Sequence, residues 1–186
     1  SHTSTLLENE INDPVAIAQK GNITYVASWQ DGLAELENNE LSILYNNSNS
    51  SLQKRFPHDD WTNIGAIEFD SEGNLWCTNA QTLEPLSVQY TNGEWASFSL
   101  GNTVTETQNL AKLIIDQNDQ KWIQLKNNGL VVFDETRSGT KAKKISNGEN
   151  NGNLSSDRVF SMAEDLDGEI WIGTDNGVCV FYDPSA

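Results

Sequence analysis

The sequence contains four aromatic-centred segments that recur at nearly regular intervals. Their central aromatic residues are Tyr25, Trp76, Trp122 and Trp171, which follow one another at intervals of 51, 46 and 49 residues. In each unit an apolar segment ends in a polar turn, a second apolar segment carries the aromatic residue, and a third segment follows another turn. Repeats of about 45–50 residues that hold several short strands are typical of β-propeller blades.

The turns between these segments have the composition of tight β-hairpins. The turns before the aromatic residues are QKGN, DSEGN, DQNDQ and DLDGE. Gly and Asn tolerate the positive φ that such turns require, and Asp side chains bond to the nearby backbone. A second turn contains Gly32, Gly129 or Gly177, although the second unit has AQTLEPL instead. Because no segment sustains helical periodicity, the sequence predicts an all-β chain.

We expect a single β-propeller domain of four blades, most of them with four antiparallel strands. The expected blades span about residues 13–60, 61–100, 101–152 and 153–186, and a strand at residues 3–7 could complete the last one. The segments LSILYN, EWASFSL and KAKKISN predict the outer strands of the first three. Four blades form either a small closed ring or an arc of a larger propeller, and an arc would leave blade faces free to self-associate.

The six tryptophans fall into two groups. Trp76, Trp122 and Trp171 are expected to pack between blades, because a residue that recurs once per blade usually belongs to the core. Trp29, Trp61 and Trp95 break this register, and Trp29 and Trp61 lie near predicted turns. We therefore consider these two residues candidates for contact with a ligand or partner.

Charge excludes one class of partner. The chain has 27 acidic and 11 basic residues, a net charge of −16. A nucleic-acid backbone requires clustered Lys and Arg, so we expect no nucleic-acid binding. One basic cluster stands out on a predicted loop and outer strand, namely Arg137, Lys141, Lys143 and Lys144. It is a candidate contact for an acidic sugar or phosphate, or alternatively an edge strand that lysines protect from unwanted pairing.

The sequence offers no pattern for catalysis, a cofactor or a metal. Cys77 and Cys179 are too few and too far apart for a metal knuckle, and both are expected to be buried thiols. His58 has acidic neighbours but no accompanying nucleophile motif. The segment Asp165–Gly168 has only part of a calcium loop, and a β-turn accounts for it. We expect no catalytic, cofactor-binding or metal-binding residues.

The last unit resembles a known repeat. The stretch LSSDRVFSMAEDLDGEIWIGTDNGV, at residues 154–178, is similar to the two-component-regulator propeller repeat. Such repeats fill the periplasmic sensors of hybrid histidine kinases and occur in a surface component of the type IX secretion system. The opening DPVAIAQKGNITYVASWQDGLAEL and the ending VFYDPS resemble the secretion-system proteins more closely.

This resemblance implies a non-enzymatic binding or scaffold propeller of a cell-envelope protein, located in the periplasm or at the bacterial cell surface. The implied partners are other envelope or secretion-system proteins, together with anionic lipopolysaccharide or carbohydrate. The alternative is a periplasmic carbohydrate-sensing domain of a two-component regulator. No run approaches the ~18 apolar residues of a membrane span, and the first residues show no signal-peptide pattern.

Overall fold

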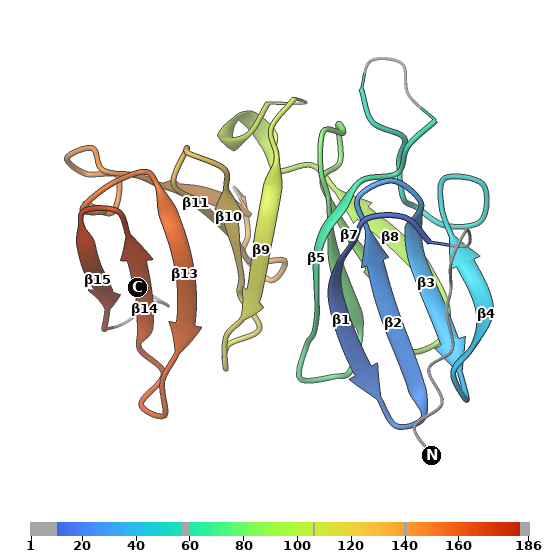
Figure 1. Cartoon of the computed structure of the whole chain (residues 1–186). Helices are drawn as coiled ribbons and strands as arrows, with labels where there is room; N and C mark the ends of the chain where they lie inside the picture. Colours follow the sequence, from blue (N-terminus) through green and yellow to red (C-terminus); the bar gives the residue numbers. More distant parts are fainter. Residues whose placement is uncertain (1–10, 57–59, 106, 140, 183–186) are drawn as a thin grey trace.

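Four antiparallel β-sheets follow one another along the chain (Figure 1). The computed structural model describes residues 11–56, 60–105, 107–139 and 141–182. Blade 1 contains β1 (Pro14–Lys20), β2 (Ile23–Ser28), β3 (Gly32–Glu37) and β4 (Glu40–Tyr45). Blade 2 contains β5 (Ile64–Phe69), β6 (Leu75–Asn79), β7 (Leu86–Gln89) and β8 (Trp95–Phe98). The all-β prediction and the outer strands expected in these blades are confirmed.

The two remaining blades differ in strand number. Blade 3 contains β9 (Leu110–Ile115), β10 (Lys121–Leu125), β11 (Leu130–Phe133) and β12 (Ala142–Ile145), and a single turn of 3-10 helix, Gly101–Thr103, precedes it. Blade 4 contains β13 (Val159–Glu164), β14 (Ile170–Thr174) and β15 (Gly177–Phe181). The strand expected at residues 3–7 lies outside the described residues.

The blades form an open arc rather than a closed ring (Figure 1). Within the described residues, three apolar clusters join blade 1 to blade 2, blade 2 to blade 3 and blade 3 to blade 4. No such cluster joins blade 4 to blade 1 in that part of the chain. Of the two arrangements that the sequence allowed, the small closed ring is wrong and the arc is confirmed.

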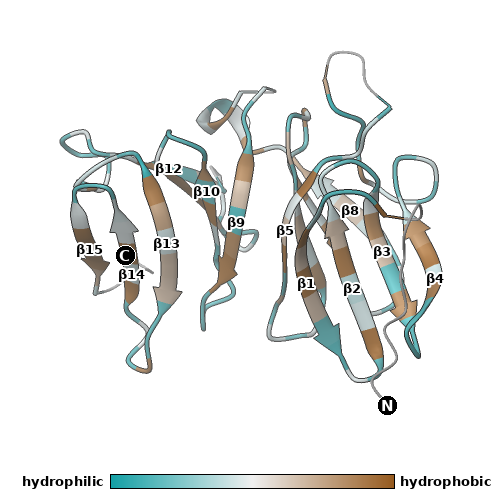
Figure 2. Ribbon diagram, in the orientation of Figure 1, coloured by the Kyte–Doolittle hydropathy of each residue, from teal (hydrophilic) through white to brown (hydrophobic). Residues whose placement is uncertain are grey.

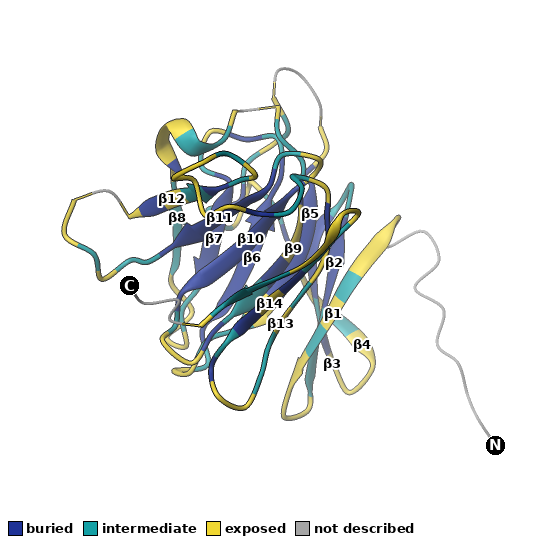
Figure 3. Ribbon diagram, turned by 90° about the vertical axis from the view of Figure 1, so that its left-hand side faces the viewer, coloured by how far each residue is buried: buried dark blue, intermediate teal, exposed yellow. Residues whose placement is uncertain are grey.

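Burial is greatest in the middle strands of blades 2 and 3. Every residue of β6 and β10 is buried, because each of these strands has a blade on both of its faces (Figure 3). The continuous apolar pattern of these strands follows from that double coverage. Figure 2 shows apolar residues mostly on the strands and polar residues mostly in the connecting turns.

The same hydrogen-bonded turn precedes the central tryptophan in blades 2, 3 and 4. One carboxylate oxygen of an aspartate accepts the indole N–H of the tryptophan six residues later. The pairs are Asp70 with Trp76 at 2.8 Å, Asp116 with Trp122 at 2.9 Å and Asp165 with Trp171 at 2.8 Å. The other oxygen accepts two backbone N–H groups of the turn. The aspartate therefore locks turn and tryptophan together.

Gly32 begins the third strand of blade 1 and Gly129 directly precedes the third strand of blade 3, and at both points the fourth strand approaches closely. A Cβ on either glycine would lie 2.2 Å from a backbone oxygen, that of Tyr45 or of Ile145. The equivalent Gly177 of blade 4 would meet nothing within 4 Å. The requirement for glycine in blades 1 and 3 thus comes partly from the outer strand that closes the sheet.

Two of the three tryptophans expected between blades are buried there. Trp76 and Trp122 are 0% and 1% exposed. The ring of Trp76 lies 6.2 Å from that of Phe133 in blade 3, and the ring of Trp122 lies 5.5 Å from that of Phe181 in blade 4, measured between centroids. Trp171 is 44% exposed, so the expectation for this residue is wrong. The physical reason is the open arc, because within the described residues no blade follows blade 4.

Candidate functional site

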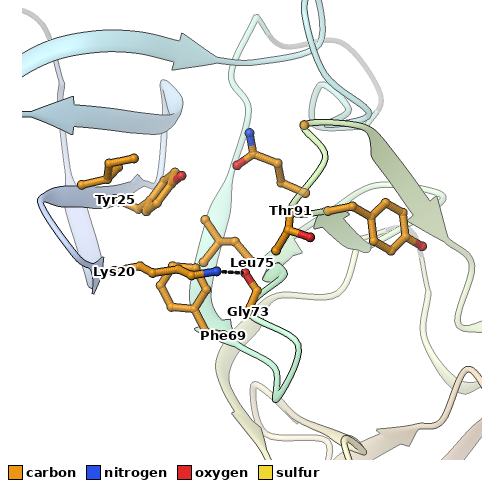
Figure 4. Close-up of a pocket in the computed structure, with 10 residues that line it drawn as sticks. Lys20, Tyr25, Phe69, Gly73, Leu75 and Thr91 are labelled. Atoms are coloured by element: carbon orange, nitrogen blue, oxygen red, sulfur yellow. Dashed lines mark hydrogen bonds between the residues drawn. The ribbon is translucent and has the colours of Figure 1, made fainter.

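A groove of about 320 Å³ opens where the ends of blades 1 and 2 meet. The turns after β1, β5 and β7 form its rim, which is the usual position of a propeller binding site. Figure 4 shows Tyr25 and Phe69 from the two blades on one side of the groove, with Thr91 across from them. The rings of Tyr25 and Phe69 pack edge to face, with centroids 5.9 Å apart.

Polar groups accompany these aromatic rings. The Lys20 ammonium donates to the Gly73 carbonyl at 2.8 Å and lies 5.6 Å from the centroid of the Phe69 ring. Gln89 also lines the groove, and its amide donates to the Tyr45 hydroxyl at 3.0 Å. The groove thus combines aromatic surface with one cation, an amide and hydroxyl groups.

The tyrosine hydroxyls of the groove stay protonated well above neutral pH. Burial, together with the negative charge of Glu35, raises the pKa of Tyr25 to about 12. Burial and the charges of Glu135 and Asp70 also raise the pKa of Tyr90. The Tyr25 hydroxyl is hydrogen-bonded to Glu35, and the Tyr90 side chain packs against the apolar cluster between blades 2 and 3.

The basic cluster lies on the loop before β12 and on that outer strand. Lys143 and Lys144 point to opposite faces of the sheet, since they pair with Val132 and Val131 of β11. The Lys144 ammonium donates to Asn128 at 2.6 Å, and Arg137 forms an ion pair with Asp134 at 3.3 Å. Lys141 and Lys143 are exposed. The four residues thus lie on one loop and the strand that follows it, and their charged groups do not all lie on one face of the sheet.

Trp29 and Trp61 lie together at the end of blades 1 and 2 opposite the groove. The N–H of Thr62 donates to the carbonyl of Gln30 at 2.8 Å, which places the two tryptophan-bearing segments side by side. Trp29 is half-buried, whereas Trp61 is 40% exposed and carries the Arg55 guanidinium 4.9 Å from its ring centroid. The structure does not bring this pair together with the basic cluster of blade 3.

The carboxylates with shifted pKa values belong to turns and ion pairs. Partial burial alone would raise the pKa of Asp70, but hydrogen bonds from Trp76 and Asn74 outweigh it and hold that pKa below its usual value. The Trp171 indole and the Glu169 amide lower the pKa of Asp165. Neither aspartate lines the groove between blades 1 and 2.

The cysteines are not paired with each other. Cys77 is fully buried, and burial raises the pKa of its thiol to about 12. Cys179 is only half-buried, so the expectation of burial is wrong for this residue, which lies in the last strand of the terminal blade. Among the described residues, no three His, Cys, Asp or Glu side chains gather into a metal-binding group. His58 lies outside them.

Sequence reasoning missed the groove residues. Lys20, Phe69 and Gln89 lie at the ends of strands, where the sequence pattern indicates only structural roles. The available signal was the polar turns QKGN and YTNGE, each next to an aromatic residue in a neighbouring blade. That adjacency becomes visible only after the blades have been stacked.

The fold is that of a β-propeller arc, and the comparisons with known proteins agree. A family described as "Two component regulator propeller" matches residues 153–176. No curated protein matches the sequence significantly. None of the helical structure in the described part of the chain has the length and apolar composition needed to cross a membrane.

Several solved structures share the fold. PorZ, an essential bacterial surface component of the type-IX secretion system of Porphyromonas gingivalis, is 20% identical with a TM-score of 0.75, and the match covers 93% of this chain and 25% of PorZ. The extracellular domain assigned to the hybrid two component system BT3049 of B. thetaiotaomicron is 24% identical with a TM-score of 0.65, over 92% of this chain and 21% of that chain. The chain thus spans a quarter or less of these two proteins.

A virginiamycin B lyase from Staphylococcus aureus also has this fold. It is 10% identical with a TM-score of 0.64, over 96% of this chain and 58% of that chain. Structures of this shape therefore include a surface component, a sensor-system domain and an enzyme. At these identities the similarity establishes the fold alone, and function must be argued from this chain's own residues.

Proposed function

We propose that this chain is a non-enzymatic binding and scaffold propeller of the bacterial cell envelope, comparable in role to the surface component PorZ. Its partners are other envelope or secretion-system proteins and saccharides, including anionic lipopolysaccharide. Its location is the periplasm or the cell surface, in line with the surface and extracellular descriptions of the similar structures.

The observation that carries this proposal is the use of the ionisable side chains. An enzyme of this fold would be expected to place shifted carboxylates or a histidine in one cleft. Here the carboxylates with shifted pKa values, as far as the chain is described, belong to turns and ion pairs: Asp60, Asp70, Asp134, Asp165 and Glu169. None of them lines the groove between blades 1 and 2.

The groove supports binding of an oligosaccharide. Sugar rings have one apolar face and a rim of hydroxyl groups, which matches aromatic surface next to donors and acceptors. Tyr25 and Phe69 supply the aromatic surface, and Gln89 supplies an amide. Lys20 adds a single positive charge, which favours a sugar that carries a carboxylate or phosphate.

A titration with envelope-type oligosaccharides tests this proposal. Neutral and uronic-acid-containing oligosaccharides would be added to the labelled protein and followed by the amide chemical shifts. We expect saturable shifts at the groove turns, and Phe69→Ala should weaken binding up to about tenfold through lost stacking. Lys20→Met should weaken the acidic sugar more than the neutral one.

The matched control is Trp61→Ala at the opposite end of the same two blades, which should leave the affinity unchanged. The recovered sugar should also be intact after prolonged incubation. Absence of binding at millimolar sugar would rule out the saccharide ligand, and cleavage of the sugar would contradict the non-enzymatic role.

The second candidate is the carbohydrate-sensing domain of a two-component regulator, favoured by the repeat at residues 153–176. Both functions would use the same groove, so ligand binding does not distinguish them. The other domains that the complete gene encodes do. A histidine kinase after a membrane span in that gene would favour the sensor and would exclude the scaffold.

A further inference from the structure

The exposed face of blade 4 has the same composition as two faces that are buried between blades. Each central tryptophan lies opposite a valine of the next strand. The pairs are Trp76 with Val88, Trp122 with Val132 and Trp171 with Val180. Two residues before each valine, on the same face, the third strand carries Leu86, Leu130 or Val178.

These three faces have similar residues, but the face of blade 4 is exposed whereas those of blades 2 and 3 are buried. Leu86 and Leu130 are fully buried, as are the tryptophans beside them. On blade 4, Val178 is 65% exposed and Trp171 is 44% exposed. Blade 4 therefore presents an apolar docking face of the kind that, in blades 2 and 3, is covered by the next blade.

At the opposite end of the arc, the outward face of blade 1 is exposed along β1, whereas Val26, Ala34 and Leu36 on that face are already buried in a small cluster. Ile17 of β1 occupies the place of Ile67 in blade 2 and Leu113 in blade 3, because each lies opposite the residue that follows the central aromatic. Ile67 and Leu113 are each 6% exposed, under the preceding blade. Ile17 is 70% exposed, and Val15 on the same strand is 48% exposed.

We propose that two copies of this chain associate head to tail, with the blade 4 face of each copy on the blade 1 face of the other. This contact continues an interface that already occurs three times within one chain. Because a heterologous contact either closes or extends into a fibre, closure of two four-bladed arcs gives an eight-bladed ring with no free face.

Charge sets the conditions for this association. Each copy carries a net charge of −16, so two copies repel one another, whereas the docking faces are apolar. Salt screens the repulsion and leaves the apolar contact intact. The dimer should therefore be favoured as the ionic strength rises, opposite to the behaviour of a salt-bridged interface.

Light scattering after size exclusion, over micromolar to sub-millimolar concentrations, tests the proposal. We expect a species of twice the chain mass that dissociates on dilution. Val178→Glu and Ile17→Glu should each raise the dissociation constant by at least about 100-fold, since each places a charge in both apolar contacts of the ring.

Mixing the two variants distinguishes the head-to-tail arrangement. A mixed pair keeps one contact in which both faces are unaltered, so the mixture should recover a dimer that neither variant forms alone. Leu166→Glu is the matched control, because Leu166 is fully exposed in the β13–β14 turn of the same blade and lies on neither face. It should behave as the unaltered chain does.

Both substituted residues are exposed, so the variants should keep the circular dichroism spectrum of the parent chain. A parent chain that stays monomeric throughout would overturn the proposal. So would a dimer that survives Ile17→Glu, an assembly larger than two chains, or a mixture of the variants that remains monomeric.

Discussion

The aspartate that precedes each central tryptophan performs several tasks with one side chain. Asp116 accepts the indole N–H of Trp122 and two backbone N–H groups, and two of these three donors, the indole and the Gln120 N–H, are buried. A buried donor without a partner costs about 1–3 kcal/mol, so this arrangement matters more than the strength of any single bond. The acidic residues of these turns are thus structural, although their spacing superficially suggests a cation site.

Gly129 and Gly177 offer a comparison of the same substitution in two surroundings. Both have positive φ, 75° and 111°, so alanine at either position should cost about 1–3 kcal/mol of strain. Gly129→Ala should cost more, because its Cβ would also lie 2.2 Å from the Ile145 carbonyl oxygen. Urea unfolding of the two variants measures the difference, and equal losses would contradict the role of the fourth strand.

Two raised pKa values predict a loss of stability at alkaline pH. The thiol of Cys77 and the hydroxyl of Tyr25 ionise at about 12 in the folded chain, against ordinary values of 9.0 and 10.0. Because the unfolded chain releases these protons first, the free energy of unfolding should fall from about pH 9 to pH 12 and be unaffected below. Cys77→Ala should delay the onset by about one pH unit, as measured by urea unfolding at each pH.

At the scale of elements, side chains of β6, β8 and β10 meet around Trp76 at the junction of blades 2 and 3. The ring of Trp76 in β6 stacks on that of Phe98, with centroids 5.6 Å apart. The Lys121 ammonium of β10 lies 4.0 Å from the centroid of the Trp76 ring. Lys121 is 1% exposed and forms an ion pair with Glu135 at 3.1 Å. A charged side chain thus crosses an otherwise apolar contact.

This ion pair predicts an asymmetric response to substitution. Glu135→Gln should cost about 2 kcal/mol, less than the ~3–5 kcal/mol of a fully buried pair, because the Glu135 side chain is 32% exposed. Lys121→Met should change stability by less than about 1 kcal/mol, since an apolar side chain of similar volume replaces the charge. In thermal or urea unfolding, the double variant should recover the loss. A double variant as unstable as Glu135→Gln alone would contradict the argument.

At the scale of the whole molecule, the described residues of each blade pack only against the blades before and after it along the arc, and these contacts stabilise it. Blades 2 and 3 have a neighbour on both faces, whereas blade 4 has three described strands and only blade 3 beside it. In such linear arrays stability is approximately a sum of unit and interface contributions. The ends of the arc should therefore open more readily than its middle.

Hydrogen exchange of the Val178→Glu variant measures this gradient without the proposed dimer contact. We expect the amides of β6 and β10 to be protected longest and those of β13 and β15 to exchange first. Peptide-level mass spectrometry resolves these strands. Uniform protection across the four blades would instead indicate a single cooperative unit.

The sequence by itself determined the repeat, the strands and the turn chemistry, because these depend on residues close together in the chain. The spacing of Trp76, Trp122 and Trp171 predicted the blades. The burial of Trp76 and Trp122 follows from this repeat, because consecutive blades pack on one another. The exposure of Trp171 and the groove beside Tyr25 and Phe69 were decided only by the tertiary structure. Both depend on which blade lies next to which and on where the arc stops, and identical side chains become buried or exposed according to that neighbour.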